Sequence, residues 1–272
     1  MNTADTARVI VGVDGSEQAL AAVRVAATEA AHRDEPLHIV HAFIWPSLHA
    51  DGAGLREHAD DLVAEAVAEA ARVAPGIRIT TEVVDGAATP VLLAESRRGD
   101  LLVLGDRGLG GISGLIVGSV AVHAAAHADC PVLVVRDTAP TGGAVVVGVD
   151  GSATSQLAVG FAFAEAAYRG ADLAPVLVWD GKPTGELGQE EAMLLLSESL
   201  AGWGERFPDV TVRPELIRGN ARHALVERSK DAQLTVVGAR GRDTFTGLLL
   251  GSVSQTLLYH SAGPVAVIRN GR

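Results

Sequence analysis

"GDRGLGGISGLIVGS", residues Gly105–Ser119, follows the apolar run "LLVL" and contains six glycines. The same arrangement returns as "GARGRDTFTGLLLGS", residues Gly238–Ser252, after "LTVV". Both copies share the spacing Gly-x2-Gly-x9-Gly-Ser, although the residues between the glycines differ. Glycine lets a backbone approach an anion closely, and a helix beginning at each Gly-Ser offers free N–H groups and a partial positive charge. The segment therefore predicts a phosphate-binding loop in each half, and the alternative is a purely structural turn.

Two further landmarks repeat in the same order. "VIVGVDGS" begins at Val9 and "VVVGVDGS" at Val145, while "CPVLVVR" begins at Cys130 and "GPVAVIR" at Gly263. The chain is therefore a duplication of two homologous halves. The joint, "DTAPTGGA" at 137–144, lacks apolar periodicity and is typical of a linker. We expect one domain over 1–139 and a second over 143–272.

Each half alternates strand patterns with helix patterns. The β-branched run at 7–13 suits a strand buried on both faces, and the helical spacing at 16–33 begins with Ser16 as a cap. Further strands are expected at 36–43, 77–84, 100–105 and 131–135, and further helices at 55–74, 88–98 and 119–128. The second half repeats this plan from Ala144 to Arg269. Such alternation predicts an α/β fold of two tandem doubly wound domains, each with a five-stranded parallel sheet and helices on both faces.

Composition limits the classes of function. The 272 residues carry a net charge of −11, which disfavours a general nucleic-acid binder, and 48% are hydrophobic, enough for a sizeable core. One cysteine allows no disulfide within the chain. The N-terminal stretch lacks the pattern of a signal peptide, and no apolar run is long enough for a membrane helix. We expect a cytoplasmic protein that binds neither nucleic acid nor membrane.

Other chemical motifs are weak. The sequence has no G-x-x-x-x-G-K-[ST], no G-x-G-x-x-G after either first strand and no G-x-S-x-G. His123 and His127 have a helical spacing that can hold zinc, but nothing else at ligand spacing joins them, so solvated histidines are the default. His38 and His41 lie three apart on a strand and point to opposite faces. Cys130 aligns with Gly263, which excludes a duplicated catalytic role. We expect a small buried thiol, and an exposed redox role is left open.

"V-x-VDGS" closing the first strand, together with Gly-x2-Gly-x9-Gly-Ser after the fourth, resembles the universal stress protein family in its tandem two-domain form. The resemblance covers almost the whole chain. It implies the strand order 3-2-1-4-5, ATP bound in the crevice between strands 1 and 4, and a role in stress or dormancy response. Both halves keep the long motif, so two ATP sites per chain are expected.

The resemblance also assigns residues to these sites. The loop glycines and the Gly-Ser helix start hold phosphates, the acidic residue after strand 1 lies near the nucleotide, and the apolar residue ending strand 2 packs on adenine. Asp14 and Asp150 also suit an ordinary turn and cap, with a ribose or Mg2+ contact added. Ser119 and Ser252 suit either a hydroxyl donor or a helix cap. The nucleotide-binding residues so expected are Gly12, Asp14, Ala42, Gly105, Arg107, Gly108, Gly118, Ser119 and Val120, and then Gly148, Asp150, Val178, Gly238, Arg240, Gly241, Gly251, Ser252 and Val253.

Three functions compete. The first is a regulator whose ATP occupancy changes the surface it presents to an unknown protein partner. The second is a slow ATPase or phosphotransferase, which needs Asp14 or Asp150 as a base because no other general base is evident. The third is a chaperone-like interaction module with an empty pocket. We expect the first, with at most weak hydrolysis and no catalytic residue. The resemblance also implies that "PVLVV" and "PVAVI" pair as an intrachain pseudo-dimer, and it leaves a homodimer open.

Overall fold

The structure is a computed structural model that describes residues 7–44, 52–109, 117–136, 142–179, 188–242 and 249–270, with side chains of the second helix from residue 56 onward. The chain divides into two compact units, Met1–Asp137 and Thr138–Arg272. Residues 137–141 of the expected linker, and with them the end of the expected first domain at 139, lie outside the described residues. So do 110–116 and 243–248 within the two glycine segments.

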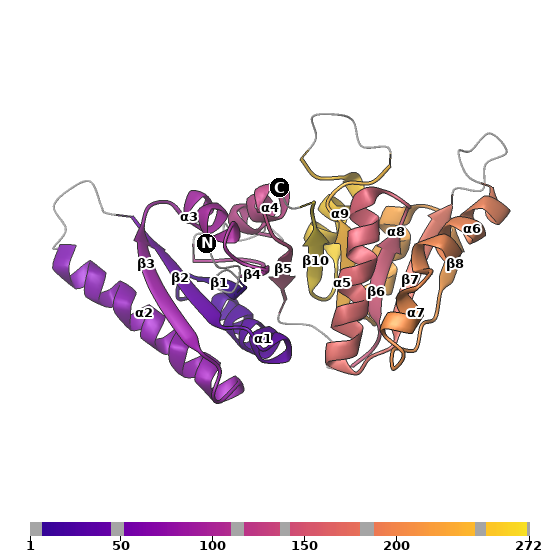
Figure 1. The fold of residues 1–272 in the computed structure, drawn as a ribbon. Helices are drawn as coiled ribbons and strands as arrows, with labels where there is room; N and C mark the ends of the chain where they lie inside the picture. The colour runs from indigo at the N-terminus through magenta and orange to yellow at the C-terminus, as the bar shows by residue number, and fades with distance from the viewer. Residues whose placement is uncertain are drawn as a thin grey trace. The chain divides into compact units, whose positions relative to one another are not determined.

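The first unit is a five-stranded sheet in the order β3-β2-β1-β4-β5, and its strand pairings are parallel. Helices α1 and α2 pack together on one face of the sheet, and α3 and α4 pack together on the other (Figure 1). The elements are β1 Val9–Val13, α1 Glu17–Arg33, β2 Leu37–Phe43, α2 Gly52–Val73, β3 Ile79–Asp85, α3 Ala88–Ser96, β4 Leu101–Gly105, α4 Ser119–His127 and β5 Val132–Val135.

The second unit repeats this order as β8-β7-β6-β9-β10, again with parallel pairings. It differs by a four-residue helix, α7, and by a shorter outer strand. Its elements are β6 Val145–Val149, α5 Ala153–Arg169, β7 Leu173–Trp179, α6 Gln189–Leu200, α7 Trp203–Arg206, β8 Glu215–Arg218, α8 Ala221–Arg228, β9 Leu234–Gly238, α9 Ser252–His260 and β10 Val265–Ile268. Both units thus confirm the predicted fold and strand order.

The central strands are nearly continuous runs of buried Val, Leu and Ile, because helices cover both faces. The helices that follow β1 and β6 begin at matching caps. Ser16 Oγ accepts a hydrogen bond from Ala19 N, and Ser152 Oγ accepts one from Ser155 N, as the sequence predicted for Ser16. Across the described ranges, no helix is long and apolar enough to cross a membrane.

In each unit, two neighbouring strands stop pairing before they end: β1 and β4 in the first unit, and β6 and β9 in the second. β1 pairs with β4 only as far as Val11 and Val103, although β1 continues to Val13 and β4 to Gly105. In the second unit the pairing of β6 with β9 stops at Val147 and Val236. The chain winds in opposite directions from these two strands, so their carboxyl ends form the kind of crevice where ligands bind open parallel sheets.

Candidate functional site

A cavity of about 490 Å3 lies at this crevice in the first unit. Its volume falls in the range of about 300–1,000 Å3 that is typical of small-molecule sites. All nine residues expected for the first nucleotide site line it: Gly12, Asp14, Ala42, Gly105, Arg107, Gly108, Gly118, Ser119 and Val120. The fold therefore brings together residues from β1, β2, β4 and the start of α4. The most distant pair in the chain, Gly12 and Val120, is 108 positions apart.

One wall of the cavity is apolar. Beside Ala42, it is formed by Val40 of β2, Ala88 and Leu92 of α3, and Leu104 of β4. Sequence analysis did not identify the last four residues as part of the site. The i, i+4 spacing of Ala88 and Leu92 places both on one helix face, and this spacing is the only sequence feature that could have pointed to them. The lining also includes glycines and the start of α4, so the cavity combines apolar side chains with backbone N–H groups.

The side chain of Asp14, just after β1, is hydrogen-bonded both to the start of α1 and to the glycine segment. Its Oδ1 accepts hydrogen bonds from Ser16 N at 3.1 Å and from Ser16 Oγ at 2.6 Å. Its Oδ2 accepts a third from Leu109 N at 2.8 Å. A Cβ added at Gly108 would run into the same Oδ2, so glycine is required here by the close approach of the carboxylate. Asp14 therefore holds the loop in place as well as lining the cavity.

Helix α4 begins without a side-chain cap. Its N-cap residue is Gly118, so Ser119 is the first helical residue and does not cap the helix. Gly118 N donates to Asp106 O at 2.7 Å, which fixes the end of the glycine segment against its beginning. The first N–H groups of an α-helix have no partner within the helix. Here they line the cavity at an exposed serine, where they can donate to an anion.

Arg107 and its counterpart Arg240 differ in their surroundings. The half-exposed Arg107 side chain lies near Asp106, with Nε 3.6 Å from Oδ2. The residue before Arg240 is Ala239, so the second unit has no carboxylate at that position. A guanidinium beside a carboxylate is partly neutralised before any phosphate arrives, whereas Arg240 is exposed next to an apolar residue. The two predicted arginines are thus not equivalent.

The second unit repeats the aspartate contacts and the uncapped helix start of the first. Asp150 Oδ1 accepts from Ser152 N at 2.9 Å, and its Oδ2 accepts from Arg242 N at 3.2 Å. Gly251 is the uncapped N-cap of α9, and its N–H donates to Ala239 O at 2.7 Å. The backbone hydrogen bonds to the aspartate therefore recur in the second copy, whereas Ser152 Oγ donates to Arg240 O and not to the aspartate as Ser16 Oγ does. The remaining expected residues lie at matching positions: Gly148 in β6, Val178 in β7, Gly238 at the end of β9, Arg240 and Gly241 just after it, and Ser252 and Val253 in the first turn of α9.

Cys130 and the histidine pair His123 and His127 do not line the cavity of the first unit. Cys130 is 4% exposed, and burial, with Asp100 nearby, raises the pKa of its thiol to about 12. The rings of His123 and His127 are exposed and stacked at 6.1 Å, and each Nδ1 lies near the carbonyl oxygen four residues earlier. Within the described part of the chain no third metal-ligating side chain joins this pair.

The Cys130 thiol is expected to be unreactive in the native protein. Because its pKa is raised to about 12, only about one thiol in ten thousand is ionised at pH 8, and the thiolate is the reactive form. Ellman's reagent at pH 8 should label no thiol within minutes in native protein and one per chain after denaturation. Stoichiometric labelling of the native protein at that pH would contradict the buried assignment.

The chain matches the family model described as the universal stress protein family twice, over residues 6–136 and 143–269. It is 36% identical to a universal stress protein of Mycolicibacterium smegmatis and 38% identical to universal stress protein Rv2005c of Mycobacterium tuberculosis, with 96% of each chain covered in both comparisons. The fold resembles the crystal structure of an Archaeoglobus fulgidus universal stress protein, with a TM-score of 0.75, 19% identity, and 98% of this chain and 99% of that chain covered. The protein described above belongs to the universal stress protein family, with two family domains in tandem.

Proposed function

We propose that each unit binds one ATP molecule at the crevice between its two middle strands, so that the chain holds two. The observation that carries this proposal is the cavity of about 490 Å3, which combines an apolar wall with the uncapped start of α4. An adenine ring is flat and largely apolar on its faces, whereas a triphosphate needs several N–H donors. The lining of the first unit's cavity offers both environments.

The residues then divide into three roles. Ala42 in the first unit and Val178 in the second pack on adenine, and the larger valine makes the second pocket tighter. The N–H groups at Gly118–Val120 and Gly251–Val253 donate to phosphate oxygens, favoured by the helix dipole. Asp14 and Asp150 hold the loops, because their carboxylates already accept hydrogen bonds from backbone N–H groups on both sides.

Binding without fast turnover is the activity that this arrangement favours. Hydrolysis needs a group positioned to take a proton from water. Asp14 and Asp150 already accept hydrogen bonds from loop N–H groups, and Asp106, the other carboxylate that lines the first cavity, lies beside Arg107 and Arg136. We therefore propose a cytoplasmic regulator in which ATP occupancy stabilises the glycine segment. A protein partner would then read the surface of that segment.

The test is to identify what the purified protein carries. Protein prepared without added nucleotide is denatured, and the released small molecules are identified and quantified by mass spectrometry. We expect adenine nucleotide at up to two per chain, with ATP preserved during hours of incubation. Protein that releases no adenine nucleotide, and takes up none after incubation with ATP, would contradict the proposal.

A further inference from the structure

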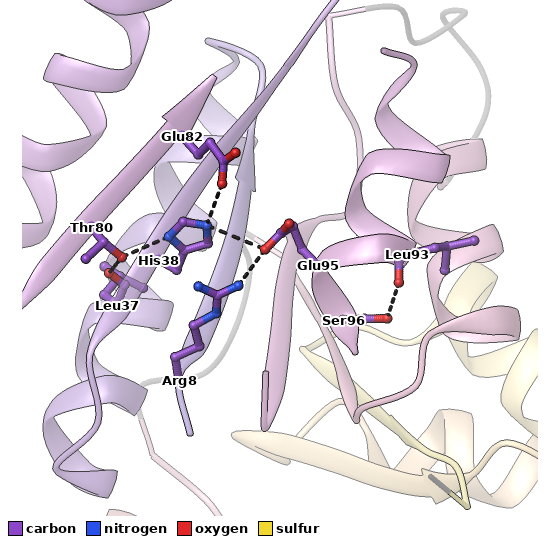
Figure 2. Close-up of polar contacts among 8 residues, drawn as sticks. All are labelled: Arg8, Leu37, His38, Thr80, Glu82, Leu93, Glu95 and Ser96. Carbon is purple, nitrogen blue, oxygen red and sulfur yellow. Dashed lines mark hydrogen bonds and ion pairs between the residues drawn. The ribbon is translucent and has the colours of Figure 1, made fainter. Parts of the chain in front are cut away.

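A second cluster of polar side chains lies at the other end of the first unit's sheet. His38 of β2 is 4% exposed, and its Nε2 lies 3.7 Å from Glu82 Oε2 and 3.6 Å from Glu95 Oε2. Figure 2 shows the imidazole between Glu82 of β3, Glu95 of α3 and Arg8, which precedes β1. These distances exceed those of hydrogen bonds, and Nε2 is a buried nitrogen with no hydrogen-bond partner among the described residues.

One tautomer of the His38 ring leaves Nε2 able to bind a cation. His38 Nδ1 lies 2.8 Å from Thr80 Oγ1, and this hydroxyl can donate to Leu37 O at 3.5 Å. When Thr80 donates to Leu37 it accepts from Nδ1–H, and the lone pair then lies on Nε2. That lone pair faces two carboxylate oxygens, an arrangement that is repulsive unless a cation lies between them.

A metal-binding histidine coordinates the ion through an unprotonated ring nitrogen, and its other nitrogen donates to a neighbouring side chain or carbonyl oxygen. With Nδ1–H donating to Thr80 Oγ1, the buried Nε2 of His38 is presented in this form toward Glu82 and Glu95.

The second unit provides an internal comparison. Ser96 and Ser229 occupy equivalent positions, because each hydroxyl donates to the carbonyl oxygen three residues earlier and accepts the N–H of a residue 33 positions later. One residue before them, Glu95 corresponds to Arg228, whose Nη2 pairs with Glu215 Oε2 at 2.6 Å. His38 corresponds to the buried Ala174. The second unit thus pairs opposite charges where the first places two carboxylates around a histidine.

We propose that His38 Nε2, Glu82 and Glu95 bind a divalent transition-metal ion of the zinc class, with water completing the coordination. The ligand atoms all lie within 4.8 Å of one another. With bonds of about 2.1 Å, separations of 3.6 and 3.7 Å correspond to ligand angles of about 120° at the ion, so a small inward shift of the exposed Glu82 side chain brings them toward the tetrahedral angle of about 109°. Glu82 is the exposed member, so the ion enters from its side. The Nδ1–Thr80–Leu37 chain orients the ring as outer-shell partners do in zinc sites.

The positive charge of Arg8 weakens the binding of a metal ion at this site. Arg8 Nη2 lies 2.5 Å from Glu95 Oε2, the oxygen that also faces His38. A carboxylate has lone pairs for both an arginine and a metal, but two cations near one oxygen repel each other. The site is therefore weaker than it would be without Arg8, and Arg8→Met is expected to tighten zinc binding about tenfold.

The test is a zinc titration of the full chain after treatment with a chelator and removal of nucleotide, in competition with a chromophoric chelator. We expect one Zn2+ per chain. Glu82→Gln keeps an exposed side chain of the same size and should weaken binding at least tenfold, as should His38→Gln. Cobalt bound in place of zinc should give the intense visible absorption of a tetrahedral site, and this absorption should disappear in both variants.

Two controls separate this site from others. Glu57→Gln removes an exposed carboxylate on α2, and the double variant His123→Ala/His127→Ala removes the exposed histidine pair, so both should bind zinc like the original chain. Thermal melts show whether each variant is folded. If His38→Gln does not fold, the zinc affinity of Glu82→Gln alone tests the proposal. The proposal is overturned by binding weaker than about 0.1 mM, by binding unchanged in Glu82→Gln, or by binding lost with the histidine pair.

Discussion

Replacing Gly108 and Gly241 together by valine is expected to weaken ATP binding in both units at least a hundredfold. A Cβ at Gly108 would run into Asp14 Oδ2, and a Cβ at Gly241 would lie 2.6 Å from Asp150 Oδ2. Each carboxylate holds the next loop residues through a backbone N–H, so the added side chain pushes the segment off its anchor. Losing two hydrogen bonds to a charged ligand, at about 1.5–3 kcal/mol each, corresponds to this fold-change or more.

The measurement is isothermal titration of nucleotide-free protein with ATP. Each single variant should retain one site of the two, because the motifs lie in separate units. Gly204→Ala is the matched control, since a Cβ there meets nothing within 4 Å. If the folded double variant binds ATP as tightly as the original chain, the loops are not the phosphate sites.

The largest effect on stability is expected from Phe163→Ala in the second unit. Phe163 is 1% exposed, and its ring stacks on Trp203 at 5.6 Å and on Phe207 at 5.7 Å. Gly160 leaves the space that Trp203 fills, because a Cβ there would lie 2.5 Å from the indole. The substitution should lower the free energy of unfolding of this unit by about 3–5 kcal/mol through lost burial and the cavity left behind.

Urea denaturation followed by tryptophan fluorescence measures this loss, because two of the three tryptophans, Trp179 and Trp203, belong to the second unit. Leu157→Ala, on the same helix but 47% exposed, should change stability by less than about 0.5 kcal/mol. The first unit has Ala27 at the position equivalent to Phe163 and lacks this aromatic contact. ATP binding there should survive under conditions that unfold the variant second unit. Equal loss of stability in both units would show that they do not unfold separately.

The fold followed from the sequence because local and long-range signals agreed. The runs at Val9 and Val145 are continuous and β-branched, as strands buried on both faces must be, and the caps Ser16 and Ser152 begin the helices after them. The short helix Trp203–Arg206 was not expected. It depends on aromatic packing against Phe163, which lies 40 residues earlier, and no local pattern reports such a contact.

The glycine and helix-start residues of the candidate site could be predicted because they need a special backbone. Of the apolar wall only Ala42 was expected. The spacing of Ala88 and Leu92 places them on one helix face, but it does not say which cavity that face reaches, because this depends on how α3 crosses the sheet. The His38 cluster was missed for a related reason. Its carboxylates come from β3 and α3, so sequence spacing gives no metal motif, and the three ligands meet only through strand register and helix packing.

A crystal structure of the protein grown with excess ATP tests the central claim most directly. We predict triphosphate density within hydrogen-bond distance of the backbone N–H groups at Ser119 and Ser252, with adenine against Ala42 and Val178. Density in neither crevice at saturating ATP, or a nucleotide bound elsewhere while both glycine segments stay empty, would contradict the account.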